Sequence, residues 1–223
     1  MTESSIVAAV RVCIDEIGIN DASWIKGEDD QDMDTIIKSK ILDAIRYIYT
    51  HADWSVLIPD TIIDADAAEP EEGSDGIWKA DVEMTDFLRL CFVKGENWRA
   101  YVTEPILWTD PEYATLSDIY STGSNVHPKA GIAPYAVTSG GTTTTGYNLK
   151  VYSCEDPGDI TVGYMKMPTG GEGTEPDYSL NGDIAPAVIY YIAGLTLLTY
   201  NDQHADDMFK QALVLARAAE KQG

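Results

Sequence analysis

Basic residues are scarce in this chain of 223 residues. Lys and Arg together number 15, whereas Asp and Glu number 37, so the formal net charge is −22. Proteins bind nucleic acid tightly through Lys and Arg side chains that neutralise phosphates and release counterions, so this balance disfavours a nucleic-acid-binding function. It suits a basic protein partner, or a surface past which DNA slides without sticking.

Cysteine and histidine are also too few and too scattered for the common sites that use them. The three cysteines form no CxxC motif, which disfavours a disulfide framework and predicts reduced, mostly buried thiols. The histidines form no HExxH or zinc-knuckle motif. We therefore predict no metal, no cofactor and no catalytic residue. The residues concerned are Cys13, Cys91, Cys154, His51, His127 and His204.

Long hydrophobic runs are missing as well. The apolar segment 184–200 has no charged residue, but a membrane span needs about 20 apolar residues with Lys or Arg beside them. Here Asp183 and Asp202 flank the segment, so we predict a buried central helix. Residues 1–18 lack the basic start and the long apolar core of a signal peptide, which predicts synthesis in the cytoplasm and no membrane association.

Apolar residues at steps of three and four predict two helices at each end of the chain. Asp183 is the expected cap of the third helix, which tolerates Pro186 in its first turn, and Asn201 with Asp202 breaks the third helix from the fourth. The expected helices cover residues 4–17, 35–52, 184–200 and 204–221.

The segment between the helix pairs favours strands and turns. Residues 53–58 alternate toward a proline and predict an extended strand, while the ten acidic residues of 60–86 predict a solvated loop. Residues 87–102 and 147–167 each predict a β-hairpin, because two strand-like runs flank a short turn that contains glycine. The Thr-, Ser- and Gly-rich stretch 109–146 predicts a loop with one or two short strands.

This order predicts an α+β fold. The N- and C-terminal helix pairs are expected to form one helical bundle, with an antiparallel β-rich module inserted between them. The expected domains are 1–57 for the first half of the bundle, 58–180 for the inserted β-rich domain and 181–223 for the second half.

Three stretches match functional loops only superficially. Residues 30–34 begin like a calcium loop, but the sixth and twelfth positions hold Thr35 and Ile41 instead of Gly and Glu. Residues 170–174 lack the Lys-Ser/Thr pair of a phosphate loop. The carboxylates of 60–86 could include an acid–base pair for glycoside cleavage, but with so many acids a chance pair says little.

Aromatic side chains concentrate at predicted strand positions and in the apolar helix. Trp and Tyr favour subunit interfaces because they bury a large area and keep a polar tip, yet they fill β cores equally well. Both interpretations stay open, with sugar binding by exposed rings as a third. The candidates for a subunit interface or core are Trp54, Trp98, Tyr101, Trp108, Tyr190 and Tyr191.

Four landmarks follow one another along the chain. They are the helix end 45–57 (IRYIYTHADWSVL), the strand 86–90 (DFLRL) with its turn to Trp98, the strand 160–168 (ITVGYMKMP) and the helix start 183–191 (DIAPAVIYY). This layout resembles the head-to-tail connector proteins of tailed bacteriophages, of the portal-adaptor and tail-tubular kind. The resemblance spans nearly the whole chain in order and texture, and the chain departs from the family pattern in 60–86 and 139–146.

The resemblance implies a structural, non-enzymatic virion protein that forms a ring, commonly of twelve copies, between portal and tail. The implied partners are further copies of itself, the portal protein and adjacent neck or tail proteins. Double-stranded DNA would pass through the lumen during genome packaging and ejection without specific binding, and an acidic inner wall would repel its phosphates. The implied location is the virion neck, after assembly in the host cytoplasm.

Two functions of other classes stay in view. A monomeric module could hold a glycan or a peptide on its aromatic strands. A hydrolase could use scattered carboxylates such as Asp64 and Glu69.

Overall fold

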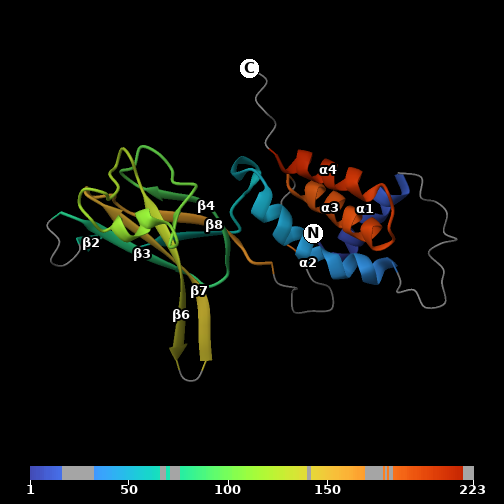
Figure 1. Cartoon of the computed structure of the whole chain (residues 1–223), viewed down its shortest axis with the longest axis horizontal. Coiled ribbons are helices and arrows are strands. Elements are labelled where there is room, and N and C mark those ends of the chain that lie inside the picture. Colours follow the sequence, from blue (N-terminus) through green and yellow to red (C-terminus); the bar gives the residue numbers. More distant parts are fainter. Residues whose placement is uncertain are drawn as a thin grey trace, which may run out of the picture. The chain divides into compact units, whose positions relative to one another are not determined.

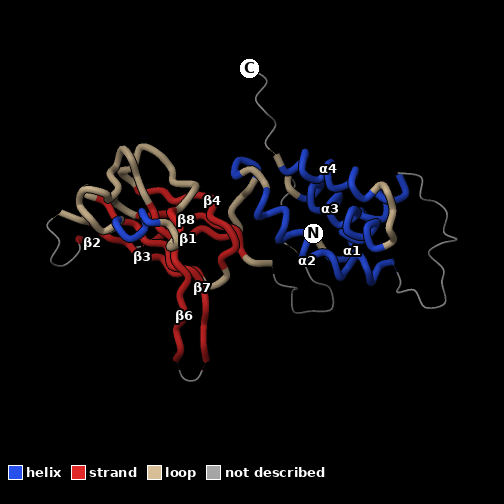
Figure 2. Tube along the Cα trace, viewed as in Figure 1, coloured by secondary structure: helices blue, strands red, loops and turns tan. Residues whose placement is uncertain are grey.

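The structure is a computed structural model that describes residues 1–16, 33–65, 69–70, 76–139, 142–168, 178, 180 and 183–217. Helices and strands occupy separate stretches of the chain, so the predicted mixed α+β class is confirmed (Figures 1 and 2). The chain divides into two compact units. The helical unit comprises Met1–Ile58 and Pro168–Gly223, and the β unit comprises Pro59–Met167.

The helical unit contains α1 (Glu3–Glu16), α2 (Met33–His51), α3 (Ala185–Thr199) and α4 (Ala205–Ala216). α3 contacts each of the other three helices, which explains why it can be apolar on all sides. Among the described residues, no helix combines the length and the apolar character that crossing a bilayer requires. The core side chains include Ile6, Val10, Ile37, Ile41, Ile45, Ile48, Val188 and Ile192.

An aromatic stack joins α2, α3 and α4. The ring of Tyr47 lies between His51 and Tyr191, with centroid distances of 4.1 and 4.4 Å and nearly parallel planes. Tyr191 also contacts Phe209 of α4 at 5.0 Å. The Phe209 ring is so close to Gly194 that a Cβ atom there would lie 2.7 Å from two ring carbons. Gly194 therefore allows α3 and α4 to pack closely.

Two helix ends differ from the prediction. The N-cap of α3 is Ile184, without a side-chain cap, rather than Asp183. Pro186 occupies the first turn as expected and removes one of the N–H groups that a cap would satisfy. α4 ends before Arg217, whose backbone is extended, instead of continuing to Lys221, which lies outside the described residues.

The exit from α2 is a 3-10 helix (η1, Trp54–Val56) and not the predicted strand. The Asp53 carboxylate accepts hydrogen bonds from both the backbone N–H and the hydroxyl of Ser55, which favours a turn over extended backbone. The Asp53 N–H donates to the carbonyl of Ala216, 2.9 Å away, and so ties this exit to the end of α4.

The strands of the β unit are β1 (Thr61–Ala65), β2 (Glu69–Pro70), β3 (Trp78–Met84), β4 (Phe87–Gly95), β5 (Ile106–Leu107), β6 (Ala130–Ser139), β7 (Thr142–Ser153) and β8 (Ile160–Lys166), with a 3-10 helix, η2 (Pro111–Thr115), after β5. They form one sheet in the order β1-β8-β4 and a second in the order β2-β3-β7-β6-β5. Side chains from both sheets share one core, in which Met84, Leu149 and Val162 are fully buried.

The acidic stretch 60–86 is not the predicted loop, because it contains β1, β2 and β3. Along β3, Val82 and Met84 face the core while Asp81 and Glu83 are exposed. The many acidic residues of the stretch obscured the alternation of apolar and polar residues in WKADVEM, which is the two-residue period of a strand.

Neither predicted hairpin exists as a strand pair. β4 supplies the first strand of 87–102, but residues 98–102 form no strand, and Val102 joins Val93 in an isolated bridge with hydrogen bonds of 2.8 and 3.0 Å. β7 and β8 are strands as expected, yet they belong to different sheets. The turn at 155–158 carries the chain from one sheet to the other. The prediction was wrong here because a turn sequence alone does not show whether the strands on either side of it pair with each other.

The stretch 109–146 holds long strands instead of a loop with short ones. β6 has 10 residues and β7 has 12, and the two pair antiparallel. Their register joins Ala130 to Val151 at one end and Ser139 to Thr142 at the other. Threonine is β-branched and stiff at χ1, so a Thr-rich run suits a strand.

The predicted burial of the thiols holds for one of the three. Cys91 on β4 is buried, and burial raises the pKa of its thiol to about 11. Cys13 is half-buried, and Cys154 is exposed. The exposed thiol follows β7 directly, at the start of the passage between the two sheets.

Thiol labelling tests this arrangement. At neutral pH a thiol reagent should modify Cys154 in the native protein but Cys91 only after unfolding, because a buried thiol with a pKa of about 11 presents almost no thiolate. Mass spectrometry after timed labelling measures both rates. Native labelling of Cys91 at the rate of Cys154 would contradict the burial of β4.

The close approach of α3 and α4 predicts a coupled pair of effects. Gly194→Ala should lower the free energy of unfolding by about 1–3 kcal/mol, because the added methyl group overlaps the Phe209 ring. In a Phe209→Ala background the same change should stabilise by about 1 kcal/mol, the helix preference of Ala over Gly. Denaturant unfolding of the four proteins measures the coupling, and equal effects in both backgrounds would show that the contact is absent.

Candidate functional site

The β6–β7 hairpin extends beyond the rest of its sheet (Figure 1). β3 pairs with β7 only as far as Met84 opposite Tyr147, and β5 has only two residues to pair with β6. Among the described strands, residues 134–139 therefore pair only with residues 142–147 of β7, of which Tyr147 alone also pairs with β3. We call these residues the arm. Such a two-stranded ribbon has two unpaired edges and little stability of its own in water.

The arm and its base carry no charge. Residues 130–149 include no Asp, Glu, Lys or Arg, although the chain as a whole has a formal net charge of −22. A stretch without charge avoids both the desolvation of ions and the repulsion between like-charged molecules. This part of the protein can therefore approach a second acidic protein with the least electrostatic cost.

One face of the arm continues the hydrophobic core of the β unit. Side chains alternate along a strand, so every second residue of β6 and β7 lies on the face that packs in the core. From the sheet outward, that face changes from buried (Ala130, Ile132, Leu149, Val151) to exposed (Pro134, Ala136, Thr145), with Tyr147 40% exposed at the boundary. We call Pro134, Ala136, Thr145 and Tyr147 the arm face. It is a core surface that the described chain leaves uncovered.

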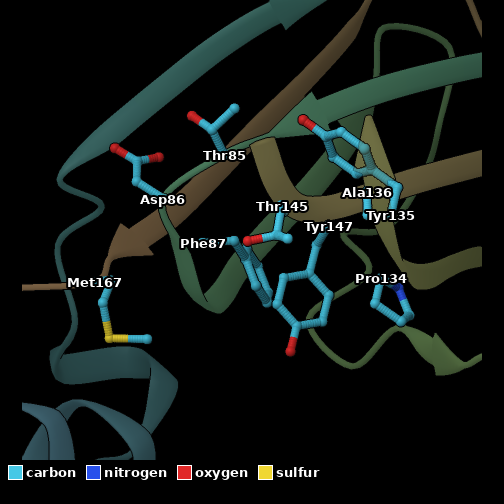
Figure 3. A pocket seen from close by; sticks show the side chains of 10 residues that line it. Thr85, Asp86, Phe87, Pro134, Tyr135, Ala136, Thr145, Tyr147 and Met167 are labelled. Carbon is cyan, nitrogen blue, oxygen red and sulfur yellow. The ribbon is translucent and has the colours of Figure 1, made fainter. Parts of the chain in front are cut away.

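A hollow of about 560 Å³ lies where the arm leaves the sheet (Figure 3). Residues 134–136 of β6, 145–147 of β7, 85–87 at the passage from β3 to β4, and Met167 after β8 line it. The rings of Phe87 and Tyr147 contact each other with centroids 5.1 Å apart, and the partly exposed Met167 also lines the hollow. The hollow is therefore mostly apolar and aromatic, which suits an apolar or aromatic side chain.

A glycine fixes the shape of the arm at its base. Gly146 pairs with Tyr135, and a Cβ atom at Gly146 would lie 3.0 Å from the Tyr135 ring and 2.6 Å from the carbonyl oxygen of Met84. Without a side chain, β7 can pass close to the end of β3 while the tyrosine ring covers the glycine from the opposite strand.

Among the described residues that line the hollow, Asp86 alone has a carboxylate, and two partners hold it. It accepts a hydrogen bond of 2.7 Å from the Tyr164 hydroxyl and forms an ion pair of 3.3 Å with Lys166. Burial alone would raise the pKa of Asp86, but these hydrogen bonds and the charge of Lys166 outweigh it and lower the pKa. Asp86 therefore stays ionised and paired at neutral pH.

Lys166 also contacts a second carboxylate through its backbone. The Lys166 N–H donates to Asp60, 3.2 Å away. Burial raises the pKa of Asp60, against the lowering effect of this hydrogen bond and of the Lys166 charge. The two acids thus share one lysine, at the point where the chain enters β1 and leaves β8.

The connection from β5 to β6 carries further exposed apolar side chains. We call Trp108, Ile119 and Tyr120 the loop surface; all three are exposed, and Tyr120 is 95% exposed. Tyr113 and Leu116 of the same connection pack on the sheet at Gly131. A Cβ atom on Gly131 would lie 2.7 Å from the Tyr113 ring and 2.5 Å from the Leu116 side chain. Lys129 secures it by contacts of 2.8 Å to Glu112 and 2.9 Å to the carbonyl of Ser121.

Three of the residues that the sequence singled out lie in the β unit. Trp98 is 4% exposed and belongs to the core, and its indole N–H finds no acceptor among the described residues. Tyr101 is exposed, meets the Phe92 ring edge-on at 5.7 Å and has the Lys94 ammonium 5.5 Å from its own ring centroid. Trp108 is 58% exposed and belongs to the loop surface.

The other three lie in the helical unit. Trp54 begins η1, and its side chain lies outside what the structure describes. Tyr190 and Tyr191 are half-buried on α3, where Tyr191 takes part in the aromatic stack with Tyr47. The five candidates whose side chains the structure describes therefore divide between a core position, exposed rings and helix contacts.

Sequence reasoning missed the arm face. Tyr147 was placed in a hairpin strand, and Pro134 in a loop. Two signals could have found them: the uncharged run 130–149 in an acidic chain, and the Gly140-Gly141 pair between two Thr- and Ser-rich flanks, which is typical of a hairpin.

No group of three or more His, Cys, Asp or Glu residues that could hold a metal ion occurs among the described residues. Neither a protein-family model nor a curated protein sequence matches the chain.

Two tryptophans of opposite exposure give a paired test. Trp98→Ala should lower the free energy of unfolding by about 3–5 kcal/mol, because the buried ring leaves a cavity. Trp108→Ala, at a ring that is 58% exposed, should change it by about 0.5 kcal/mol or less. Denaturant unfolding at a low protein concentration measures both, and a Trp98→Ala protein as stable as the wild type would remove Trp98 from the core.

Proposed function

We propose that the protein is a structural component of a tailed-bacteriophage virion, a head-to-tail connector that forms a ring between portal and tail. The observation that carries the proposal is the arm face. It continues the core of the β unit, bears no charge and lacks a cover in the described chain. An uncovered core surface is typical of a subunit that is completed by its neighbours.

The proposed subunit has two parts. Helices from both chain ends pack as one rigid helical bundle, and the β unit is the module inserted between them. Contacts of α3 with α1, α2 and α4, and the hydrogen bond from Asp53 to Ala216, support the bundle. A subunit with two different contact surfaces can repeat head to tail and closes a ring when the rotation per subunit closes.

The ring would be non-enzymatic and commonly of twelve copies, with the portal protein and adjacent neck or tail proteins as its other partners. The formal charge of −22 favours a lumen from which DNA phosphates are repelled, so that the genome slides during packaging and ejection. Exposed acids such as Asp81 and Glu83 on β3 are of the kind that would line such a wall.

Imaging and light scattering test this function. Purified protein, over a range of concentrations and with or without the portal protein of the same virion, should form closed rings with a central opening. Negative-stain images show the opening, and light scattering after gel filtration gives the copy number. A protein that stays monomeric in both conditions would contradict the proposal.

The hollow favours a second candidate, a monomeric module that binds a glycan or a peptide. An exposed ring, Tyr147, beside a carboxylate, Asp86, is an arrangement that sugars and peptides can use. Tryptophan fluorescence during titration with oligosaccharides and peptides tests it, with Tyr147→Ala as the control. Saturable binding by a monomer, lost in that variant, would favour this candidate over the ring.

A further inference from the structure

The arm face and the anchor of the β5–β6 connection lie on opposite faces of one sheet. The arm face lies on the side of Ile132, which packs in the core. Gly131, the neighbour of Ile132 along β6, faces the other way, and there Tyr113 and Leu116 of the β5–β6 connection cover it. The connection that carries the loop surface is therefore anchored on the side of the sheet that the arm face does not share.

We infer that the arm face of one copy packs against the loop surface of a second copy. This inference rests on the proposed function, because it names the contact that joins neighbouring subunits of the ring. A second copy of this chain then occupies the arm face. Each copy contacts one neighbour through its arm face and the other neighbour through its loop surface.

Shape favours this pairing over contact between two arms. The arm face borders a hollow of about 560 Å³, and the loop surface offers projecting side chains, of which Tyr120 is 95% exposed. A projecting ring that enters an apolar hollow gains dispersion contacts on all sides. Two arms placed against each other would leave both hollows unfilled and both loop surfaces in water.

Charge favours it as well. The connection and the residues before it contain Glu104, Asp110 and Asp118, besides Glu112, whose carboxylate pairs with Lys129, so two loop surfaces placed together would repel each other. The arm, within the uncharged run 130–149, is the part of the chain that such an acidic segment can meet without repulsion. The unpaired edges of the arm also offer backbone N–H and C=O groups to the arriving loop.

A contact between two different surfaces is heterologous. Unlike a two-fold contact, it does not stop at a dimer, because every added copy presents a new arm face and a new loop surface. It therefore produces either a closed ring or an open chain of subunits.

Complementation between two defective variants tests the pairing. Ala136→Glu places a charge on the arm face, and the double variant Trp108→Ala/Tyr120→Ala removes two rings of the loop surface. Each protein alone should assemble at least tenfold more weakly than the wild type, as measured by mass photometry over a concentration series. Mixed in equal amounts, they should form dimers with one copy of each and nothing larger, since a single intact pair of surfaces remains.

Matched variants keep the test specific. Val214→Glu adds the same charge at an exposed site on α4 and should assemble like the wild type. Thr145→Glu, opposite Ala136 on the arm, should reproduce the defect of Ala136→Glu. Circular dichroism and thermal unfolding of each variant show whether it has folded, so that a loss of assembly in a folded protein is assigned to the surface.

The outcomes separate this inference from the proposed function. Rings that persist in folded Ala136→Glu and Thr145→Glu proteins, or an equal mixture that stays monomeric, overturn the pairing and leave the ring function standing. Open chains in the wild type, with dimers in the mixture, support the pairing and overturn the ring. A wild type that does not associate under any condition overturns both.

Discussion

The end of the β3–β7 pairing at Met84 and Tyr147 determines most of what is distinctive in this protein. β7 continues for five residues, 142–146, on the far side of that pair, with β6 beside it and no further described strand on either edge. Backbone groups and apolar side chains that would be satisfied inside a wider sheet are left to water or to another molecule. The hollow, the exposure of Tyr147 and the unpaired edges of the arm all follow from this difference in strand length.

The distribution of charge complements that geometry. The strong acidity of the chain is carried by outward positions such as Asp81 and Glu83 of β3, where solvent screens it. The carboxylate of Asp86, which lines the hollow, is held by Tyr164 and Lys166, and the sequence of the arm contains no acid. Charge therefore lies outside the arm and its base, and the arm is the region where another acidic surface would meet the least repulsion.

The sequence predicted the helical half better than the β half, for physical reasons. A helix leaves a local signature of period 3.6, and the four helices lie within a few residues of where that signature placed them. Strand pairing is not local. The turn at 155–158 has the chemistry of a hairpin, yet β7 and β8 enter different sheets, because their partners, β3 and β1, lie far away in the chain. The exposure of Tyr147 depends on where β3 ends, which no local pattern in the sequence reveals. The choice of candidates by residue type therefore included the core residue Trp98 and left out the arm.

The partners of β8 imply an order of events during synthesis. Residue Thr61 of β1 pairs with Tyr164 of β8, so the three-stranded sheet cannot close until almost the whole β unit has left the ribosome. α1 and α2 emerge earlier still, and α3, which contacts both, is made only after β8. The apolar sides of the first two helices must therefore wait in the nascent chain while the β unit folds, and a translation pause shortly after residue 168 would expose them to chaperones or to aggregation.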